Sequence, residues 1–341
     1  MNIGINGFGR IGRLALRAAL LRHPDVTVSA INTSGSMDMD GWAYLFKYDT
    51  AYGKFPKKIS VKAGESEREI GRLVVNGYNY TIPFFAVRNP EEIPWGSHNV
   101  HTVLESTGIF RKRDDALKHL KGGAQKIIIS APPKGGDIPL CLLKLNQDIG
   151  KEQSVISNGS CTTYSAAPVI RIIYDHFGIE RASLTTIHAY TSDQRLTDGS
   201  HPNDIRRARA AGQNIIPTSS GAAESIVAVI PEMEGKFEAT SLRVPVITGS
   251  LSDITFLTEK PVTTEEVNAV FKNEANGRYK GLIEATDDPI VSSDIIGNSA
   301  SAIIDLSLTN VIGRTMLKVF SWYDNEWSYA CRLVELASQM Q

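Results

Sequence analysis

Cysteine is scarce in this chain, and the few cysteines present form no group. Cys141, Cys161 and Cys331 are the three cysteines among 341 residues, and no two of them make a Cys-x-x-Cys pair. An odd number of widely separated cysteines is poor material for a disulfide framework or a zinc site. We therefore expect no metal site, and a reducing compartment.

Long apolar runs and a surplus of one charge are also missing. No apolar stretch approaches the roughly 18 residues that a membrane span needs. The chain has 36 Lys+Arg against 37 Asp+Glu, a formal net charge of −1, which gives no support for a nucleic acid or a membrane as partner. The first residues enter strand-like sequence without a basic and apolar leader. We expect a cytoplasmic protein.

The first third of the chain alternates strands with helices. At 341 residues the chain exceeds the size at which a single core usually stops growing, so two domains are expected. Strand patterns occupy residues 2–6, 26–32, 102–105 and 126–130, and helical patterns occupy residues 11–21 and 111–121. This alternation predicts a parallel sheet that is covered on both faces.

After about residue 180 the chain changes to longer alternating strands. They are predicted at residues 181–188, 237–246, 251–259, 302–308 and 315–322, and they favour a mostly antiparallel sheet. Thr263 and Glu266 have capping-box spacing at the start of a helix that runs to about Asn276. A final amphipathic helix is predicted over residues 324–340. The polar segment 189–214 is a long loop, and long loops in compact domains are usually functional.

A glycine-rich turn follows the first predicted strand and opens the first predicted helix. It is Gly7-Phe8-Gly9-Arg10-Ile11-Gly12, with Gly-x-Gly-x-x-Gly spacing. Here the glycines allow a tight turn, a close approach of backbone to a pyrophosphate and tight helix–strand packing, with the phosphates at the helix N-terminus. The predicted fold class is therefore α/β. A Rossmann-type dinucleotide-binding domain spans residues 1–160 and is completed by the C-terminal helix 325–341, and an α+β catalytic domain spans residues 161–324.

The second predicted strand lacks the acid that usually stands about 20 residues after such a fingerprint. Asn32 ends that strand, and Thr33-Ser34-Gly35-Ser36 follow it. A carboxylate there would repel the 2′-phosphate of NADP, whereas hydroxyls can hydrogen-bond to it. The absence predicts that NADP is accepted as well as NAD. In the alternative interpretation the loop is shifted, and Asp38 or Asp40 takes the place of the acid.

Cys161 stands where a short polar run meets an apolar segment of helical pattern. A thiol at a helix N-terminus is near the positive end of the helix dipole and near unpaired N–H groups, which favour the thiolate. A lone cysteine is more often a small buried hydrophobe. The assignment of Cys161 as a nucleophile therefore depends on the residues around it.

Several motifs in register resemble those of phosphorylating glyceraldehyde-3-phosphate dehydrogenases. They are Ile5-Asn6-Gly7-Phe8-Gly9-Arg10-Ile11-Gly12-Arg13, Ser157–Thr163, the His-Ala-Tyr-Thr-Ser-Asp-Gln of residues 188–194, the Arg-Arg-Ala-Arg-Ala-Ala of residues 206–211 and the Trp-Tyr-Asp-Asn-Glu of residues 322–326. The resemblance implies that Cys161 attacks the aldehyde of a triose phosphate to form a thiohemiacetal. Hydride transfer to a nicotinamide then leaves a thioester, which inorganic phosphate cleaves. It also implies that His188 takes the thiol proton and later stabilises the oxyanion.

The resemblance implies two anion sites as well. Thr191 and Arg243 are expected to contact the substrate phosphate, and Thr162 is counted with this substrate site. The attacking phosphate is expected on Ser160, Ser220, Gly221 and Arg207. Arginine suits this task because its planar fork binds phosphate oxygens in pairs. Arg206 and Arg209 are assigned to solvent or to subunit contacts.

The implied cofactor contacts extend over the whole chain. Asn325 is expected to hold the nicotinamide carboxamide with Tyr329 near the ring, although Asn325 could instead cap the following helix. Thr107 and Gly108 are expected against the adenosine-side ribose and the middle of the cofactor. The full predicted set is Gly7, Gly9, Arg10, Ile11, Gly12, Asn32, Thr33, Ser34, Arg88, Thr107, Gly108, Ser130, Ser200, Asn325 and Tyr329.

Four positions depart from the usual pattern of this family. The acid after the second strand is missing, as described. Ser200, in Asp198-Gly199-Ser200-His201, is similar to the serine of NADP-accepting members, which reaches the 2′-phosphate from a neighbouring subunit, and Arg88 could add a positive charge. Tyr164 and Ser165 replace the usual Asn and Cys after the nucleophile. Glu224 replaces a usual Lys, and its charge is expected to weaken phosphate binding.

The sequence therefore predicts an enzyme that oxidises D-glyceraldehyde 3-phosphate with inorganic phosphate to 1,3-bisphosphoglycerate, reversibly, and uses NADP or NAD. A homotetramer is expected from the resemblance alone. Erythrose-4-phosphate dehydrogenase is the alternative within the same class. A nucleotide-binding redox sensor, in which Cys161 is modified without turnover, is the alternative from another class.

Overall fold

The chain folds into two compact units, which are described separately. The structure is a computed structural model that describes residues 1–340. One unit comprises residues 1–159 together with the chain from Ala330 onward, and the other comprises Ser160–Tyr329. The predicted fold class is confirmed, because the first unit has a Rossmann-like parallel sheet and the second has a mixed, largely antiparallel sheet.

The first unit is built on an eight-stranded sheet in the order β10-β9-β8-β1-β2-β7-β6-β5. Its strands from β10 to β7 are parallel, and β6 and β5 continue the sheet antiparallel. The strands are β1 (Asn2–Asn6), β2 (Thr27–Asn32), β5 (Ile59–Lys62), β6 (Glu69–Val75), β7 (Thr81–Phe85), β8 (Thr102–Glu105), β9 (Lys126–Ile129) and β10 (Val155–Ser157). A separate two-stranded sheet pairs β3 (Tyr48–Asp49) with β4 (Gly53–Lys54).

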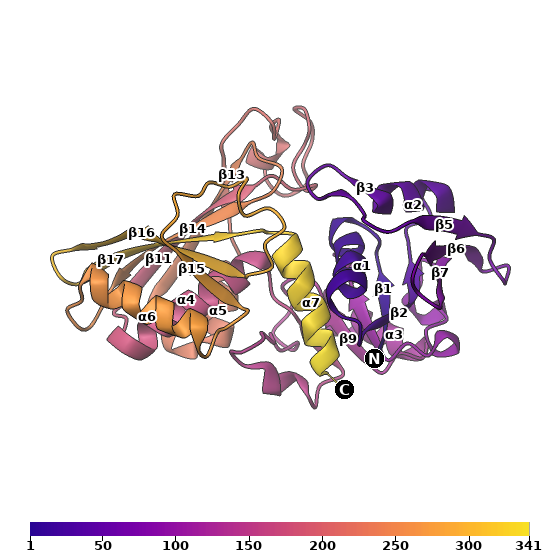
Figure 1. Cartoon of the computed structure of the whole chain (residues 1–341), viewed down its shortest axis with the longest axis horizontal. Helices are drawn as coiled ribbons and strands as arrows, with labels where there is room; N and C mark the ends of the chain where they lie inside the picture. Colours follow the sequence, from indigo (N-terminus) through magenta and orange to yellow (C-terminus); the bar gives the residue numbers. More distant parts are fainter. Residues whose placement is uncertain (341) are drawn as a thin grey trace. The chain divides into compact units, whose positions relative to one another are not determined.

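Three helices connect the strands of this unit (Figure 1). They are α1 (Arg10–Arg22), α2 (Met39–Lys47) and α3 (Arg113–Lys121), and single 3-10 turns are η1 (Pro90–Glu92), η2 (Gly96–His98) and η3 (Gln147–Gly150). The parallel strands are almost fully buried, as in Ile3, Ile5, Val103 and Leu104, because helices cover a parallel sheet. The helix predicted from residue 111 begins at Arg113, two residues later.

The second unit has a seven-stranded sheet in the order β12-β13-β11-β14-β17-β16-β15. The strands are β11 (Arg181–Ala189), β12 (Ile216–Ser219), β13 (Phe237–Val244), β14 (Ser250–Leu257), β15 (Ile283–Thr286), β16 (Ala302–Ile312) and β17 (Met316–Tyr323). The pairs β11–β13 and β15–β16 are parallel, and the other four pairs are antiparallel. The parallel pair β11–β13 places His188 beside Arg243 in register.

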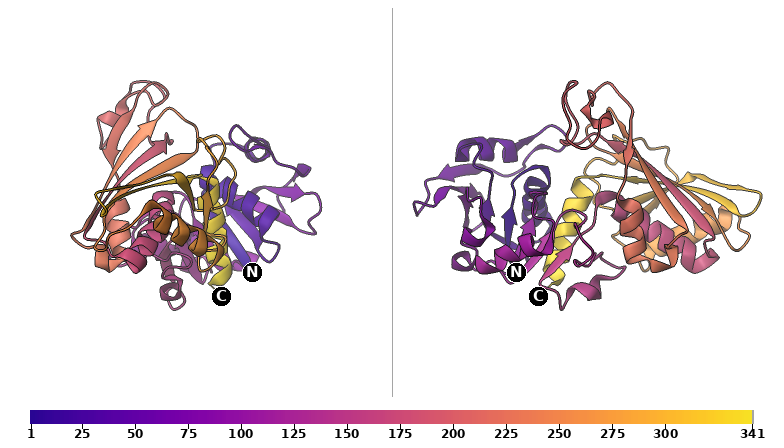
Figure 2. Two further views of the ribbon diagram at one scale, coloured as in Figure 1. Left: turned by 60° about the vertical axis from the view of Figure 1, so that its left-hand side comes forward. Right: turned by 180° about the vertical axis from the view of Figure 1, so that it is seen from behind.

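The helices of the second unit pack on one face of its sheet, as the views in Figures 1 and 2 show. They are α4 (Cys161–Phe177), α5 (Ala222–Val229) and α6 (Thr264–Asn276), with 3-10 turns η4 (Arg206–Ala208) and η5 (Pro231–Met233). Helix α4 runs through the buried Pro168. Helix α6 has the predicted capping box, in which Thr263 and Glu266 exchange hydrogen bonds.

The final helix α7 (Trp327–Gln339) begins three residues later than residue 324, where the sequence places its start. Asp324 lies in the turn between β17 and α7, and its Oδ1 accepts hydrogen bonds from the backbone N–H groups of Glu326 and Trp327 at 3.0 and 2.9 Å. Its carboxylate therefore satisfies N–H groups at the start of the helix, as a capping side chain does. Over residues 1–340, none of the helices combines the length and the apolar character that crossing a membrane would require.

Candidate active site

A pocket of about 540 Å³ opens at the carboxyl ends of the parallel strands in the first unit. Ligands of open α/β sheets bind at these strand ends. Four of the lining residues come directly at or after β1, β2, β7 and β8, namely Asn6, Asn32, Val87 and Ser106. The complete lining is Asn6, Gly7, Phe8, Gly9, Asn32, Thr33, Ser34, Trp42, Val87, Arg88, Ser106, Thr107, Ile109 and Phe110.

The three fingerprint glycines have different surroundings. Gly7 has a φ of +95°, and a Cβ there would lie 2.7 Å from the backbone nitrogen of Thr107. A Cβ on Gly12 would lie 2.0 Å from the carbonyl oxygen of Gly7, so helix α1 approaches the turn as closely as glycine permits. A Cβ on Gly9 would meet nothing within 4 Å. The turn therefore leaves room for a ligand beside Gly9, at the start of α1.

The pocket includes only part of the predicted cofactor set. Gly7, Gly9, Asn32, Thr33, Ser34, Arg88 and Thr107 line it, whereas Arg10, Ile11, Gly12, Gly108 and Ser130 do not. Arg10 instead pairs with Asp49 at 2.5 Å. Ser130 donates its backbone N–H to the Glu105 carbonyl at 2.9 Å.

No carboxylate from the loop after β2 lines the pocket. Thr33 is buried, and its hydroxyl donates to the Phe85 carbonyl at 3.1 Å and accepts from the Gly35 N–H at 3.2 Å. The hydroxyls of Ser34 and Ser36 are exposed and lie 2.8 Å apart. Asp38 caps α2 by accepting from the Gly41 N–H at 2.8 Å, and neither Asp38 nor Asp40 lines the pocket.

Arg88 is the one cation among the lining residues of this pocket. Its side chain is exposed, and within residues 1–340 it forms no ion pair or hydrogen bond. An unpaired guanidinium at the rim of a pocket without carboxylates favours an anionic group of a ligand.

In the second unit, the cysteine predicted as nucleophile is the first residue of α4. Ser160 is the N-cap, and its hydroxyl accepts from the Thr163 N–H at 3.1 Å. The half-buried Cys161 has its Sγ 3.4 Å from Nε2 of His188. His188 comes from the end of β11 and is 4% exposed. The fold thus brings together two residues that are 27 positions apart in the sequence.

The environment of the pair determines its protonation. Burial raises the pKa of the Cys161 thiol above its ordinary value, while the Arg243 charge and hydrogen bonding by Thr162 oppose this shift. Burial, with Arg243 second, lowers the pKa of His188 to about 3. The helix N-terminus therefore acts in the predicted direction but is outweighed by burial. Both shifts favour the uncharged thiol and the uncharged imidazole over their charged forms, so a proton donor lies beside a proton acceptor.

His188 is oriented through its other ring nitrogen. Nδ1 lies 2.6 Å from the carbonyl oxygen of Ala189 and 2.6 Å from Nη1 of Arg243, and this Nη1 also donates to the same carbonyl at 3.2 Å. The Ala189 carbonyl can only accept and the Arg243 guanidinium can only donate, so the two neighbours of Nδ1 favour opposite tautomers of the ring. In the tautomer in which Nε2 accepts the thiol proton, Nδ1 carries the ring proton and donates it to the Ala189 carbonyl. Arg243 is then a neighbouring positive charge, not a hydrogen-bond donor to the ring, and it opposes a second proton there.

Tyr323 supports both residues of the pair and was not singled out from the sequence. Its buried hydroxyl lies 3.0 Å from Oγ1 of Thr162 and 2.7 Å from Oγ1 of Thr186, and its ring packs edge-on to His188 at 6.0 Å. The alternation of buried residues along β17, Leu317, Val319, Ser321 and Tyr323, was the available signal. Thr162, predicted as a substrate contact, uses its hydroxyl for this support.

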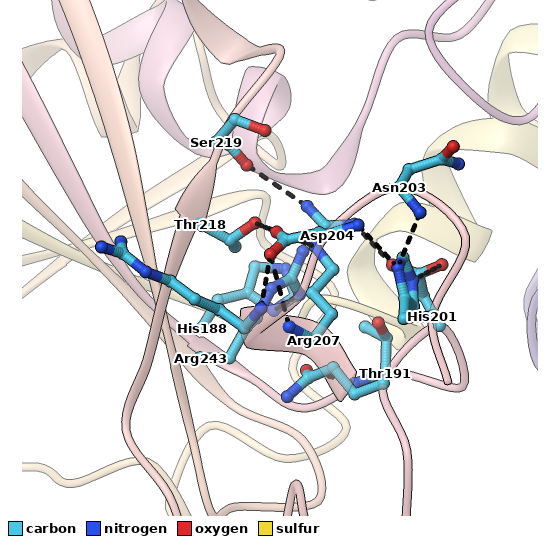
Figure 3. Close-up of polar contacts among 12 residues, drawn as sticks. His188, Thr191, His201, Asn203, Asp204, Arg207, Thr218, Ser219 and Arg243 are labelled. Atoms are coloured by element: carbon cyan, nitrogen blue, oxygen red, sulfur yellow. Dashed lines mark hydrogen bonds and ion pairs between the residues drawn. The ribbon is translucent and has the colours of Figure 1, made fainter. Parts of the chain in front are cut away.

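The two arginines predicted to bind phosphate differ in how many of their guanidinium nitrogens already bond to other protein groups (Figure 3). Arg207 bonds to Asp193 at 2.5 Å, to Thr218 at 2.9 Å and to Asp204 at 3.3 Å, so acids and a hydroxyl of the protein surround its guanidinium. Arg243 uses Nη1 toward His188 and the Ala189 carbonyl, and its Nη2 and Nε make no bond in the described chain. Arg243 therefore retains two donors for an anion.

The remaining predicted phosphate residues are less constrained. The Thr191 N–H donates to Oε1 of Gln194 at 3.2 Å, which leaves its hydroxyl without a partner among residues 1–340. The Ser220 hydroxyl accepts from the Ala222 N–H at 3.2 Å, and Gly221 directly precedes α5. Exposed Glu224 lies in the first turn of α5, with Oε2 4.0 Å from the Cβ position of Gly221. A negative charge therefore stands beside the predicted phosphate site.

Asn325 does not cap the last helix, so that alternative is wrong. Its Oδ1 accepts from the Gly249 N–H at 3.1 Å and the Ser250 hydroxyl at 2.9 Å, while Asp324 provides the cap. These two bonds fix the amide and direct its Nδ2 away from them. Tyr329 is buried and packs edge-on to the buried Tyr164 at 6.4 Å. Exposed Ser200 accepts from Nε of Arg195 through its carbonyl at 2.7 Å.

Comparison with known proteins gives matches along nearly the whole chain. Residues 1–113 match the family described as "Glyceraldehyde 3-phosphate dehydrogenase, NAD binding domain", and residues 160–325 match "Glyceraldehyde 3-phosphate dehydrogenase, C-terminal domain". The chain is 46% identical to glyceraldehyde-3-phosphate dehydrogenase 2 of Streptomyces avermitilis, covering 98% of this chain and 97% of that protein. It is 46% identical to the glyceraldehyde-3-phosphate dehydrogenase of Geobacillus stearothermophilus and 45% identical to glyceraldehyde-3-phosphate dehydrogenase 1 of Bacillus subtilis, each over 99% of this chain and 97% of the relative.

Proposed function

Because this chain belongs to the glyceraldehyde-3-phosphate dehydrogenase family, we propose that it converts D-glyceraldehyde 3-phosphate and inorganic phosphate reversibly to 1,3-bisphosphoglycerate. The observation that carries the proposal is the 3.4 Å contact between Sγ of Cys161 and Nε2 of His188 at the start of α4. A thiol beside a neutral imidazole is a nucleophile with its general base.

The first step forms a bond between Sγ of Cys161 and the aldehyde carbon. The thiol proton passes to Nε2 of His188, and the resulting imidazolium protonates the aldehyde oxygen, which gives a thiohemiacetal. Because burial keeps the pKa of His188 low, the imidazolium returns its proton readily. The free donors of Arg243 and the Thr191 hydroxyl are proposed to hold the substrate phosphate.

The second half of the reaction cleaves a thioester on Cys161. The dinucleotide, when bound, would supply the acceptor for the hydride that leaves the thiohemiacetal carbon, and Nε2 of His188 takes the hydroxyl proton, which leaves the thioester. A phosphate oxygen then attacks the carbonyl carbon, the carbon–sulfur bond breaks, and Cys161 leaves as thiolate. Ser160, Ser220, Gly221 and Arg207 are proposed to bind this phosphate. Exchange of the Asp193 partner of Arg207 for phosphate is part of this proposal.

The pocket of the first unit fits a dinucleotide by its shape and its donors. The positive φ of Gly7 and the open space at Gly9 allow a pyrophosphate to approach the N-terminus of α1. The remaining cofactor residues, including Asn325 with its directed Nδ2 and Tyr329, are proposed contacts because their motifs match those of the family. Residues 1–160 with 325–341 are proposed as the cofactor domain, and 161–324 as the catalytic domain.

NADP acceptance is the finer part of this proposal. The pocket has no carboxylate, exposed Ser34 and Ser36 follow β2, and Arg88 has no protein partner in the described chain. These features support a 2′-phosphate contact, to which Ser200 of a neighbouring subunit could add a hydroxyl. The Thr33 hydroxyl is already hydrogen-bonded within the protein, so it is not proposed to bond to the 2′-phosphate. Thr33 favours NADP because it is uncharged, whereas an acid at this position would repel the 2′-phosphate.

Replacement of Thr33 by aspartate tests the cofactor assignment. We expect Thr33→Asp to lower kcat/KM with NADP by roughly tenfold, and with NAD much less, because a carboxylate would repel the 2′-phosphate. Steady-state rates with each dinucleotide measure the difference. An equal loss with both would contradict a 2′-phosphate site at the end of β2.

A homotetramer is proposed for the assembled enzyme. Leu196, Ile205 and Ile215, in the long polar loop and at its end, are 88%, 86% and 68% exposed, and such apolar side chains are available for a subunit contact. Sedimentation equilibrium of the purified chain tests this point, and a monomer at micromolar concentration would contradict it.

Initial rates with glyceraldehyde 3-phosphate and phosphate, first with NAD and then with NADP, test the function directly. Erythrose 4-phosphate is the competing substrate, and a higher kcat/KM with it would reassign the enzyme. A redox sensor would bind dinucleotide but show no phosphate-dependent turnover. The retained donors of Arg243 beside His188 speak against a sensor, which has no need of a substrate anion site.

A further inference from the structure

A buried polar network lies behind the dinucleotide pocket, and the proposed mechanism does not use it. Trp95, Glu105 and His119 are at most 1% exposed, and Asn6 and Asn32 are 1% and 4% exposed. Burying so many polar groups is costly unless each has a partner. Each of these residues has a hydrogen-bond partner within the network.

The direction of each bond in the network follows from chemistry. The indole N–H of Trp95 can only donate, and it lies 3.0 Å from Nδ1 of His119, so Nδ1 is an acceptor. The ring proton of His119 is therefore on Nε2, which donates to Oε2 of Glu105 at 3.0 Å. His119 is thus neutral, and Glu105 is left as an acceptor for every neighbour.

Glu105 connects this histidine to the wall of the pocket. Its Oε2 accepts from Nδ2 of Asn6 at 2.5 Å, and its Oε1 accepts from the N–H of Thr107 at 2.8 Å and from the Thr107 hydroxyl. Oδ1 of Asn6 then accepts from Nδ2 of Asn32 at 2.8 Å. Two further hydrogen bonds join Asn32 to Val87. Nδ2 of Asn32 donates to the Val87 carbonyl at 2.8 Å, and the Val87 N–H donates to Oδ1 of Asn32 at 2.9 Å.

The network therefore joins the ends of four strands. Asn6, Asn32 and Glu105 are the last residues of β1, β2 and β8, and Val87 follows β7. Asn6, Asn32, Val87 and Thr107 line the dinucleotide pocket, whereas His119 and Trp95 do not. Trp95 itself is fixed, since a Cβ on Gly4 of β1 would lie 2.6 Å from its ring.

We propose that His119 and Trp95 are positioning residues for dinucleotide binding. They hold Glu105 in one orientation, and Glu105 in turn sets the distance between the pocket walls formed by Asn6, Thr107 and the Asn32–Val87 pair. This role rests on the proposed dinucleotide function of the pocket. Without the network, the strand ends must be ordered by the ligand itself, which lowers affinity. The chemical step, on the other unit's Cys161 and His188, does not depend on it.

The test measures dinucleotide Kd directly by calorimetry on the full chain, beside steady-state kinetics. His119→Leu is expected to raise Kd and KM for the dinucleotide about tenfold, because buried partners lose their bonds, while kcat and the KM for aldehyde stay near wild type. His119→Gln is expected to recover most of the affinity, since its amide can accept from Trp95 and donate to Glu105. Trp95→Phe removes one N–H donor and should raise Kd about threefold.

Leu117→Ala is the matched control, because Leu117 lies on the same helix α3 and packs against an apolar cluster outside the network. It should lower the unfolding temperature while keeping the wild-type Kd. If His119→Leu also kept the wild-type Kd, or if His119→Gln gave no recovery, the positioning role would be wrong. Should His119→Leu fail to fold, an unchanged Kd in Trp95→Phe would overturn the proposal. Wild-type protein that binds neither NAD nor NADP would instead refute the proposed function.

Discussion

At the scale of single residues, the reactive pair is made by position as much as by residue type. Cys161 is half-buried and His188 is almost fully buried, and both properties come from the packing of α4 against the sheet. Cys141 provides a contrast within the same chain: burial raises its pKa to about 11, and its thiol donates to the carbonyl of Gln147 and not to a histidine. Burial alone thus makes an inert thiol, and a neighbouring base makes a usable one.

Cys161→Ser and His188→Asn should each remove most dehydrogenase activity, by about a thousandfold or more, as is typical when a nucleophile or its base is lost. Dinucleotide affinity should remain at the wild-type value, because neither residue lines the pocket of the first unit. Turnover and calorimetric Kd measured on the same preparations separate the two effects. Near-full turnover in the serine variant would contradict covalent catalysis.

Arg243 is expected to control how readily Cys161 ionises. Its positive charge lowers the pKa of Cys161 against the effect of burial, so its loss disfavours the thiolate. In Arg243→Met, the rate of alkylation of Cys161 should therefore reach its half-maximal value at a higher pH than in wild type. The pH profile of inactivation by iodoacetamide measures this shift.

Arg209→Met is the control for this pH profile, since exposed Arg209 pairs with Asp198 in the loop. Arg209→Met should leave the pH dependence of Cys161 alkylation unchanged. A profile for Arg243→Met that is unchanged, or moved to lower pH, would show that another group sets the ionisation of Cys161.

At the scale of elements, the proposed anion sites lie at the N-termini of helices. The start of α1 faces the open space at Gly9, and the start of α5 follows Ser220 and Gly221. The first turn of a helix attracts an anion. In α5 that turn already holds the carboxylate of Glu224, whose charge would oppose phosphate binding at the proposed site.

Glu224→Lys is therefore expected to lower the KM for inorganic phosphate by roughly two- to fivefold, the range of charge effects at a helix end. The KM for the dinucleotide should not change. Kinetics with varied phosphate at fixed aldehyde give this value. Glu234→Lys, which makes the same charge change at an exposed position, is the control. An equal effect of both variants would assign the change to net charge and not to the site.

At the scale of the whole molecule, ligand binding should be visible as stability. A dinucleotide that binds only the folded chain stabilises it by about 2.7 kcal/mol when present at 100 times its Kd. The unfolding temperature in thermal scans should therefore rise with both NAD and NADP, and the two shifts should follow the two affinities. Absence of a shift with either dinucleotide, at millimolar concentration, would contradict the assignment of the pocket.

The sequence by itself determined the fold class and part of the order of elements, and it predicted the residues of the proposed site. Alternating strands and helices, the Gly7–Gly12 fingerprint and the capping box at Thr263 are local patterns, and local geometry follows from them without distant contacts. The motif order around Cys161 and His188 predicted the two residues of the proposed reactive pair, which the structure places 3.4 Å apart. The local pattern placed the start of α7 at residue 324, three residues before the helix begins at Trp327.

Only the tertiary structure decided what each side chain does with its polar atoms. In the folded chain the Thr33 hydroxyl donates to the Phe85 carbonyl and Arg207 is paired with acids. Two donor nitrogens of Arg243 remain without a protein partner in the described chain. The tertiary structure also closed the chain of bonds from Trp95 to Val87, which joins residues distant in sequence. The burial of a side chain and its hydrogen-bond partners depend on neighbours that folding brings together from distant parts of the sequence. Neither can therefore be predicted from the local sequence alone.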